Sequence, residues 1–422
     1  MRIRPLLLSL CLASGLAAPD TARGQDPAPP PQDPHTGHDM SGGSASLWML
    51  MSDGVLFGTF NHQGGPRGGD EFRSTNWLMG MASRPAGGGT LTLTGMVSLE
   101  PVTVGACGYG LLFQVGEACD GRLLVDRQHP HDLLMQASVA WRVPLNTSTS
   151  LTLAAAPVGE PALGPVAFMH RPSAAENATA PLAHHWLDST HIAMGVVSAG
   201  VQRGRWTAES SLFHAGEPDD NRWDLMDPGA LDSWSARVWF DPSPEWSVQI
   251  SHGFLKQPEA FEVGDARRTT ASIAWWHKRR NGFSATTVAY GRNDKSHDDY
   301  GALLAEATHR RGAYTAYGRF EILQLELEPL LSEQHGGPLH HHEAFEGIPN
   351  DLASLTLGGT RELGVWHGFE VAAGADAAVQ WLPLALTFTH GTRPVSFHAF
   401  LRIRPPVGHM GRMGAMRMGG QH

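Results

Sequence analysis

Hydrophobic and polar residues alternate along most of the chain from about residue 47 onward, in segments of about ten residues. The alternation is clearest in Thr90–Leu99, Trp246–Ser251 and Phe369–Trp381. Successive side chains of a β-strand point to opposite faces, so each of these segments would have one apolar and one polar face. The pattern therefore predicts an all-β protein.

The spacing of these segments predicts about sixteen strands, within a range of roughly 14 to 18. They begin near residues 54, 72, 89, 132, 148, 191, 204, 232, 245, 268, 283, 302, 313, 352, 368 and 394. Connections after even-numbered strands are short, as at Gln202-Arg203, and most of those after odd-numbered strands are long, as at Glu100–His131 and Pro157–Thr190. This rhythm is typical of a transmembrane antiparallel up-and-down β-barrel with short periplasmic turns and long extracellular loops.

The physics of a bilayer favours the same architecture. In hydrocarbon every backbone donor needs a partner, so a sheet can cross a membrane only when it closes on itself. Aromatic residues such as Trp141, Trp206 and Trp381 lie near strand ends, where the interfacial girdles of a barrel are found. A soluble β-sandwich or propeller would explain the alternation but not the rhythm of the connections. After residue 25 no apolar run is long enough for a transmembrane helix.

The N-terminus has the three parts of a cleaved export signal. Arg2 and Arg4 precede the apolar stretch Leu6–Leu16, and Ala22-Arg23-Gly24 is a small-x-small cleavage site. We therefore expect export to the bacterial outer membrane. The predicted organisation is a signal peptide (1–24), a Pro/His/Gly-rich disordered periplasmic linker (25–46), the barrel (47–404) and a Met/His/Gly-rich disordered tail (405–422).

Composition and charge restrict the partners. The formal charge of −10 provides no basic stripe that would neutralise phosphates, which excludes nucleic acid. The expected partners are outer-membrane lipid and small solutes or metal ions, because a barrel of about sixteen strands usually has a water-filled lumen. The sequence leaves homo-oligomerisation open. Cys107 and Cys119 form an even pair in an exported chain, so a disulfide is favoured over two free thiols.

Several charged residues have the parity of the inward face, since a charge facing lipid would cost a few kcal/mol. They are Glu209, Arg237, Glu306, Arg319, Glu321, Glu370 and Asp376. Two interpretations stay open: a ring of charges that selects ions, or salt bridges that brace the wall.

Histidines gather in the long connections. His129 and His131 flank Pro130, which keeps the backbone extended, so both imidazoles can point the same way. With the adjacent carboxylate of Asp132 they would suit Cu(II), Zn(II) or Ni(II); the alternative is that they are hydrogen-bonding rim residues. A second candidate set is His340, His341 and His342 in another loop, and His184-His185 lies close to His191 at a strand start.

Both ends of the mature chain combine histidine with methionine outside any predicted strand. Thioethers and imidazoles among glycines are soft ligands suited to Cu(I), although a low-complexity segment without function is the alternative. The candidate ligands are His35, His38, Met40, His409, Met410, Met413, Met416 and Met418. The predicted bound metal is therefore copper, as Cu(I) or Cu(II), or another soft or borderline metal.

Two motifs resemble known families. Gly64–Gly68, Ser74–Met79 and the string DRQHPHD at Asp126–Asp132 resemble a family of largely uncharacterised exported bacterial β-barrel proteins, over most of residues 50–400. That resemblance implies an outer-membrane barrel without an assigned activity. The stretch HTGHDMSG, which begins at His35, is similar to the Met/His-rich leader of outer-membrane copper-resistance B proteins. It implies a link to copper.

These observations predict a non-enzymatic outer-membrane barrel that conducts small solutes or ions and is linked to copper or a similar metal. The alternative is a general diffusion porin, or a structural barrel, without a metal role. A barrel hydrolase is a distant alternative: the sequence has no G-x-S-x-G motif and no serine identifiable as a partner for His129, His131 and Asp132. No catalytic or cofactor-binding residues are predicted.

Overall fold

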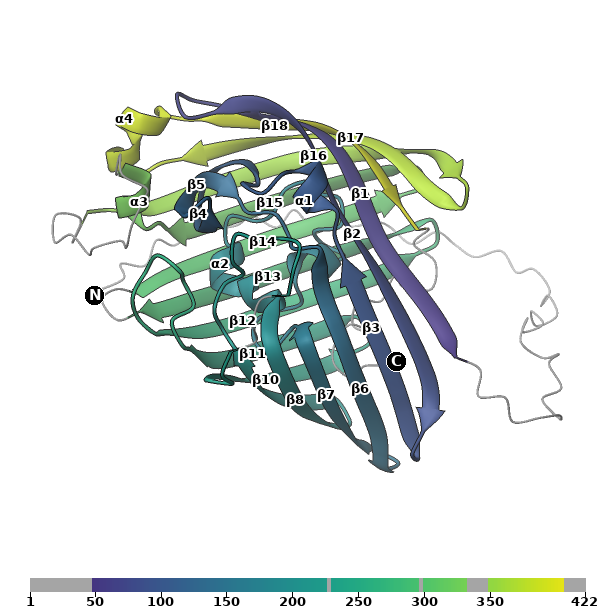
Figure 1. Ribbon diagram of the computed structural model, residues 1–422. Helices are drawn as coiled ribbons and strands as arrows, with labels where there is room; N and C mark the ends of the chain where they lie inside the picture. The colour runs from purple at the N-terminus through teal and green to yellow at the C-terminus, as the bar shows by residue number, and fades with distance from the viewer. Residues whose placement is uncertain (1–47, 226–228, 296–298, 332–347, 406–422) are drawn as a thin grey trace, which may run out of the picture. The chain divides into compact units, whose positions relative to one another are not determined.

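A computed structural model describes residues 48–225, 229–295, 299–331 and 348–405 of the chain. In these residues sixteen antiparallel strands form one closed barrel (Figure 1). The fold class predicted from the sequence is confirmed. None of the helices in the described ranges is long and apolar enough to cross a membrane. The predicted signal peptide, the linker and nearly all of the tail lie outside the described residues.

The barrel strands follow one another around the wall in chain order, except that β6 follows β3, and β18 pairs with β1 to close the sheet. They are β1 (Met49–Gln63), β2 (Gly69–Ala86), β3 (Gly89–Val97), β6 (Leu134–Asn146), β7 (Thr149–Gly159), β8 (Ala193–Arg203), β9 (Trp206–His214), β10 (Ser233–Ser243), β11 (Trp246–Leu255), β12 (Ala266–Arg279), β13 (Gly282–Lys295), β14 (Asp299–Arg311), β15 (Tyr314–Gln324), β16 (Asp351–Trp366), β17 (Phe369–Trp381) and β18 (Val395–Arg404). Each begins within about five residues of its predicted start.

The two faces of the wall are reversed relative to a soluble protein. Along β18, Phe397 and Leu401 are exposed, whereas the residues that follow each of them, His398 and Arg402, are buried. Because side chains alternate along a strand, the exposed set forms an apolar outer surface and the polar set faces the interior. A soluble β-sandwich would bury its apolar face instead, so the structure contradicts that alternative.

Two long connections fold into the barrel. The first inserted segment, residues 98–133, contains α1 (Glu100–Thr103) and the separate two-stranded sheet of β4 (Tyr109–Cys119) and β5 (Arg122–Gln128). The sequence pattern predicted only a loop here. β4 is buried on both faces, so it shows no two-residue alternation to detect. Cys107 and Cys119 of this segment form a disulfide.

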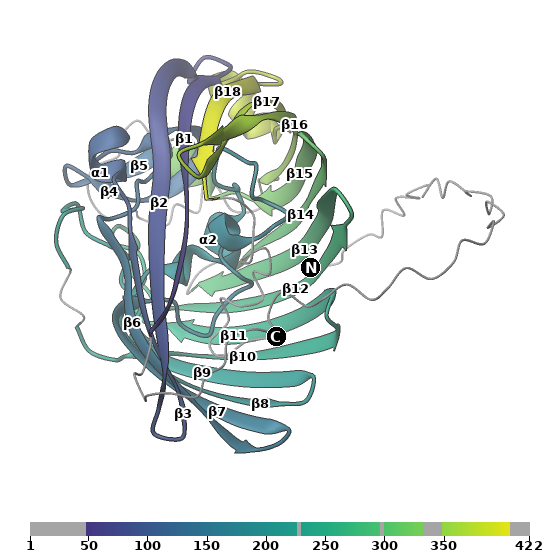
Figure 2. The same ribbon diagram turned by 90° about the vertical axis from the view of Figure 1, so that its right-hand side faces the viewer.

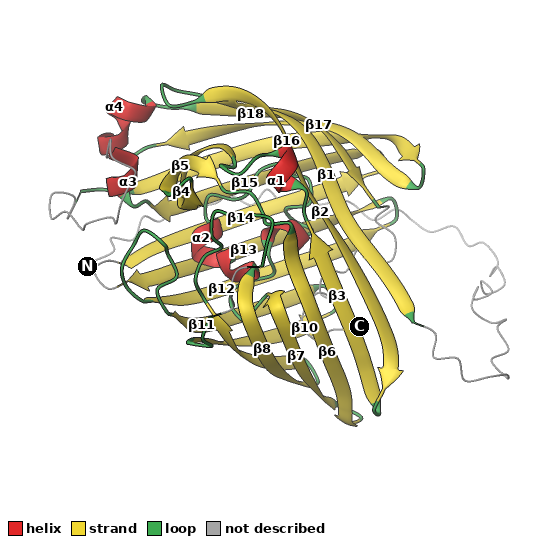
Figure 3. Cartoon of the chain, viewed as in Figure 1, coloured by secondary structure: helices red, strands yellow, loops and turns green. Residues whose placement is uncertain are grey.

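The second inserted segment, residues 160–192, contains η1 (Phe168–His170), α2 (His184–Leu187) and η2 (Ser189–His191). Figure 2 shows α2 inside the ring of strands. The remaining short helices, α3 (Leu327–Leu331), η4 (Leu384–Leu386) and α4 (Thr387–His390), lie in other connections, and Figure 3 shows α3 and α4 at one end of the barrel.

A hydrophobic core joins the inserted segments to the wall. Leu112 and Phe113 of the first inserted segment and Leu187 of the second pack with Leu304 and Leu323, which β14 and β15 contribute. Burying large apolar side chains is worth roughly 1.5–3 kcal/mol each. The interior of this barrel is therefore partly a packed core and not a free lumen.

Candidate functional site

The second inserted segment crosses the interior and is bonded to opposite parts of the wall. Where the segment begins, the guanidinium of Arg237 on β10 lies 3.2 Å from the carboxylate of Glu160. The backbone amide of Gly164 donates to the hydroxyl of Ser251 on β11 at 2.9 Å. These contacts hold the start of the segment against β10 and β11.

Farther along, the segment is held by buried ion pairs. Arg171 donates to Glu306 of β14 at 2.6 Å and to Asp188 of the same segment at 2.5 Å. Glu176 forms an ion pair with Arg402 of β18, and neither side chain is exposed to solvent. Ionic groups taken out of water need excellent geometry and a full set of partners. The path of the segment is therefore tightly specified by the wall.

The predicted lumenal charges take part in this attachment. Six of them are buried, namely Glu209, Arg237, Glu306, Arg319, Glu321 and Asp376, and Glu370 is partly buried. Their contacts are Glu209 with Arg237, Arg319 with Glu306 and the carbonyl of Thr179, Glu321 with the amide of Ala183, Asp376 with Tyr317 and His398, and Glu370 with Arg310 and Arg404. These contacts fit the interpretation that the charges brace the wall and its inserted segment.

The DRQHPHD motif forms the end of β5 and the return of the chain to the wall. Asp126 at its start lies 2.7 Å from Arg67 and 3.2 Å from His390, which come from two other connections. Asp132 at its end pairs with Arg222 at 3.3 Å. Burial raises the pKa of Asp132 to about 6. The motif therefore links its own connection to three others of the barrel. The carboxylate of Asp132 is paired with the guanidinium of Arg222.

The histidines of this motif meet those of the second inserted segment. We call His129, His131, His184, His185 and His191 the histidine cluster. The ring centroids of His184 and His191 lie 5.2 Å apart, those of His131 and His191 5.5 Å, and those of His129 and His185 5.7 Å. Five imidazoles from two inserted segments are thus gathered inside the barrel.

Hydrogen bonds orient the rings of the cluster. Nδ1 of His131 lies 3.0 Å from the carboxylate of Glu100, and Nδ1 of His184 lies 2.7 Å from that of Asp188. Nδ1 of His129 lies 3.0 Å from Glu117. These three rings direct Nε2 away from their acidic partners.

Charge and burial set the ionisation of these groups. Burial opposes ionisation of Glu100, but His131 and the amides that bond the carboxylate lower the pKa of Glu100 below its usual value. Burial opposes a charge on His131 too, but Glu100 raises the pKa of His131. Burial and the neighbouring imidazoles lower the pKa of His184 and of His191. These two rings are therefore neutral near pH 7 and available as ligands.

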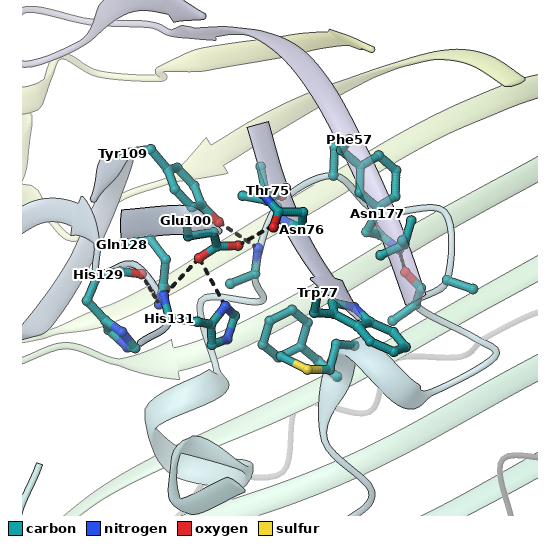
Figure 4. Close-up of a pocket in the computed structure, with 18 residues that line it drawn as sticks. Phe57, Thr75, Asn76, Trp77, Glu100, Tyr109, Gln128, His129, His131 and Asn177 are labelled. Atoms are coloured by element: carbon teal, nitrogen blue, oxygen red, sulfur yellow. Dashed lines mark hydrogen bonds and ion pairs between the residues drawn. The ribbon is translucent and has the colours of Figure 1, made fainter. Parts of the chain in front are cut away.

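A cavity of about 60 Å³ lies beside the cluster, between the inserted segments and strands β1 and β2. Figure 4 shows the carboxylate of Glu100 between the amide of Asn76 and the ring of His131. Tyr109 and Met169 also line this cavity. Met169 packs with buried methionines of the wall, which the sequence did not single out: Met79, Met96 and Met135.

The other predicted metal ligands are not placed by the structure. His340, His341 and His342 lie outside the described residues, as do His35, His38, Met40, His409, Met410, Met413, Met416 and Met418. Their role stays a prediction.

No protein-family model matches the sequence, and no curated protein matches it either. Solved structures do match. OprB of Pseudomonas putida is 8% identical, with a TM-score of 0.50, over 85% of this chain and 94% of that one. The chain has the fold of an outer-membrane porin. An anion-selective porin from Comamonas acidovorans is 11% identical, with a TM-score of 0.49, over 85% of this chain and all of that one.

Within this porin fold, the sequence pattern identifies two of the five histidines of the cluster as candidate ligands. It named His129 and His131 as ligands, but noted His184, His185 and His191 only as neighbours along the chain. The pattern does not show that residues 160–192 fold into the barrel, and this fold brings His129 and His131 next to the three histidines of the second inserted segment. The only available signal was that both sets lie in unusually long connections.

Proposed function

We propose that this chain is an outer-membrane channel for small solutes, in which the second inserted segment sets the width of the lumen. The observation that carries the proposal is the course of this segment, which is bonded to β10 and β11 at one end and to β14 and β18 farther along. A segment held in this way narrows the path through the barrel. The apolar outer surface of the wall supports the location in a membrane.

Conductance of the purified mature protein in a planar bilayer tests this proposal. We expect steady single-channel currents, and a larger conductance in Glu176→Ala, because this change removes the carboxylate that Arg402 and Arg404 hold. Arg205→Ala, an exposed change in the turn between β8 and β9, is the matched control and should conduct like the parent. Absence of current in all three proteins would contradict a channel and favour a structural barrel.

We further propose that the channel is linked to copper. The support comes from the sequence, through the histidines and methionines of the leader and the tail. Micromolar copper added to the bilayer chamber should block or gate the current. Removing residues 26–46 and 405–422 should abolish part of this response. Currents indifferent to copper in both proteins would leave a general diffusion porin without a metal role.

A further inference from the structure

We propose that His131, His191 and His184 bind one transition-metal ion inside the barrel, and that this ion is one that accepts tetrahedral coordination by imidazole, Zn(II) or Cu(I). The site does not depend on the chain being a channel. It uses only residues of the two inserted segments, and two of its three ligands were not among those predicted from the sequence.

The first observation is a pair of nitrogens that face one another. Nε2 of His131 lies 3.4 Å from Nε2 of His191. Nδ1 of His131 lies 3.0 Å from the carboxylate of Glu100, and Nδ1 of His191 lies 2.8 Å from the carbonyl oxygen of Asp188. These two oxygens can only accept, so each Nδ1 carries a proton and both Nε2 atoms point into the gap between the rings. Two such nitrogens stay close together when a proton on His131 or a metal ion lies between them, and a metal ion is the occupant proposed here.

The distance between these nitrogens indicates the coordination geometry. Zinc–imidazole bonds are about 2.0–2.1 Å long, so two imidazoles at a tetrahedral angle place their nitrogens about 3.3 Å apart. A linear two-coordinate ion would separate them by about 4 Å at the same bond length. The observed 3.4 Å between His131 and His191 matches the tetrahedral arrangement.

The third ligand is His184. Its side chain is almost completely buried, its Nδ1 lies 2.7 Å from the carboxylate of Asp188, and its Nε2 has no hydrogen-bond partner. Its ring centroid lies 5.2 Å from that of His191. Metal binding at this Nε2 would satisfy a buried polar atom that otherwise carries a desolvation cost.

Acidic groups behind the ligands support this assignment. Histidines that bind metals usually donate their second N–H to a carboxylate or a carbonyl, which fixes the tautomer and the ring orientation. Glu100 does this for His131, and Asp188 does it for His184 through its carboxylate and for His191 through its carbonyl. Arg171 in turn bonds the carboxylate of Asp188.

The surroundings select the class of ion. The donors are imidazole nitrogens, which suit zinc and copper, whereas magnesium and calcium require oxygen ligands. The ring of Phe168 packs at 5.2 Å from His184 and 6.2 Å from His191, between centroids, and keeps water away from this side. His131 also lines the cavity beside the cluster, so open space adjoins the site.

Metal binding by the full mature chain in detergent tests the proposal. We would titrate it with Zn(II) against a chromophoric chelator, with Cu(I) under anaerobic conditions, and with Co(II) as a spectroscopic probe. The double variant H131F/H191F should bind one ion fewer per chain than the parent and lose the intense visible absorption of tetrahedral Co(II). H252A/H277A, which changes two histidines of the wall, is the matched control and should retain both properties.

A second variant addresses the group behind the ligand. Glu100→Gln keeps the shape of the side chain and removes its charge, and loss of such a partner weakens metal binding about 10- to 100-fold.

An equal number of bound ions and an unchanged Co(II) spectrum in H131F/H191F would overturn the proposal and would indicate a shared proton between the two rings.

The same preparations separate this proposal from that of a channel. Bound metal without any current would leave the site standing and overturn the channel. Current in all proteins with no metal lost in H131F/H191F would overturn the site alone. The relative affinities for Zn(II) and Cu(I) in the parent decide which ion the site prefers.

Discussion

The two inserted segments lie in the same barrel but are held there by different means. Residues 98–133 form a sheet of their own from β4 and β5, and the disulfide Cys107–Cys119 links the residues just before β4 to its last residue. Residues 160–192 have only short helices, and buried ion pairs with the wall hold them in place. The first segment is therefore stabilised largely by contacts within itself, whereas the second is held in its conformation by contacts with the wall.

The largest expected effect comes from breaking the attachment of the second segment. Arg402→Ala would leave the buried carboxylate of Glu176 without its closest cation, and removing one partner of a buried ion pair typically costs about 3–5 kcal/mol. We expect the free energy of unfolding to fall by this order, as measured by urea titration of tryptophan fluorescence in lipid vesicles. Arg205→Ala should change it by less than about 0.5 kcal/mol. Equal stability of the two variants would show that the ion pair does not hold the segment.

The first segment should respond to loss of its cross-link. The disulfide closes a short loop, with a sequence separation of 12, and a loop of about 15 residues is worth about 3 kcal/mol in the chain-entropy model. C107S/C119S should therefore make residues 98–133 more sensitive to protease while the barrel stays folded. The measurement is limited proteolysis followed by mass spectrometry of the variant and the oxidised parent. The parent protein with its disulfide reduced serves as an additional sample. Cleavage confined to residues 160–192 would contradict the difference between the segments.

The smallest expected effect is a pH dependence of the second segment. Burial, with the neighbouring His131, lowers the pKa of His170 to about 3. A released histidine takes up its proton near pH 6.5, so the released state binds more protons between pH 6.5 and 3, and the inserted state loses stability as the pH falls through this window.

His170→Phe tests this pH dependence. The change keeps an aromatic ring beside Trp77, which His170 contacts edge to face at a centroid distance of 4.7 Å, and it removes the titrating nitrogen. Protease sensitivity of residues 160–192 should rise less between pH 7 and pH 4 in this variant than in the parent. The same rise in both proteins would assign the acid response to another group.

The wall could be predicted from the sequence because its pattern is local. Along β17, alternation from Phe369 to Trp381 places apolar residues on one face, and the apolar outer surface of a barrel repeats that pattern in every strand. The inserted sheet could not be found in the same way. β4 is buried on both faces, so its residues lack the alternation that marks a strand of the wall.

The histidine cluster shows the same limit at the candidate functional site. His129 and His131 are recognisable in the sequence because they stand two residues apart, which is a local property. His184 and His191 belong with them only because residues 160–192 fold inward, and no periodicity marks that course. The partner of His131 is therefore a residue 60 positions away along the chain.

The closed barrel, its approximate number of strands and the alternation of faces along each strand follow from the local sequence pattern, because a bilayer requires a sheet whose outer face is apolar and whose backbone is fully paired. What fills the interior follows only from the three-dimensional fold. The inserted segments are placed by ion pairs and hydrogen bonds between residues far apart in the chain, such as Glu176 with Arg402. Such contacts depend on three-dimensional proximity, which local periodicity does not encode.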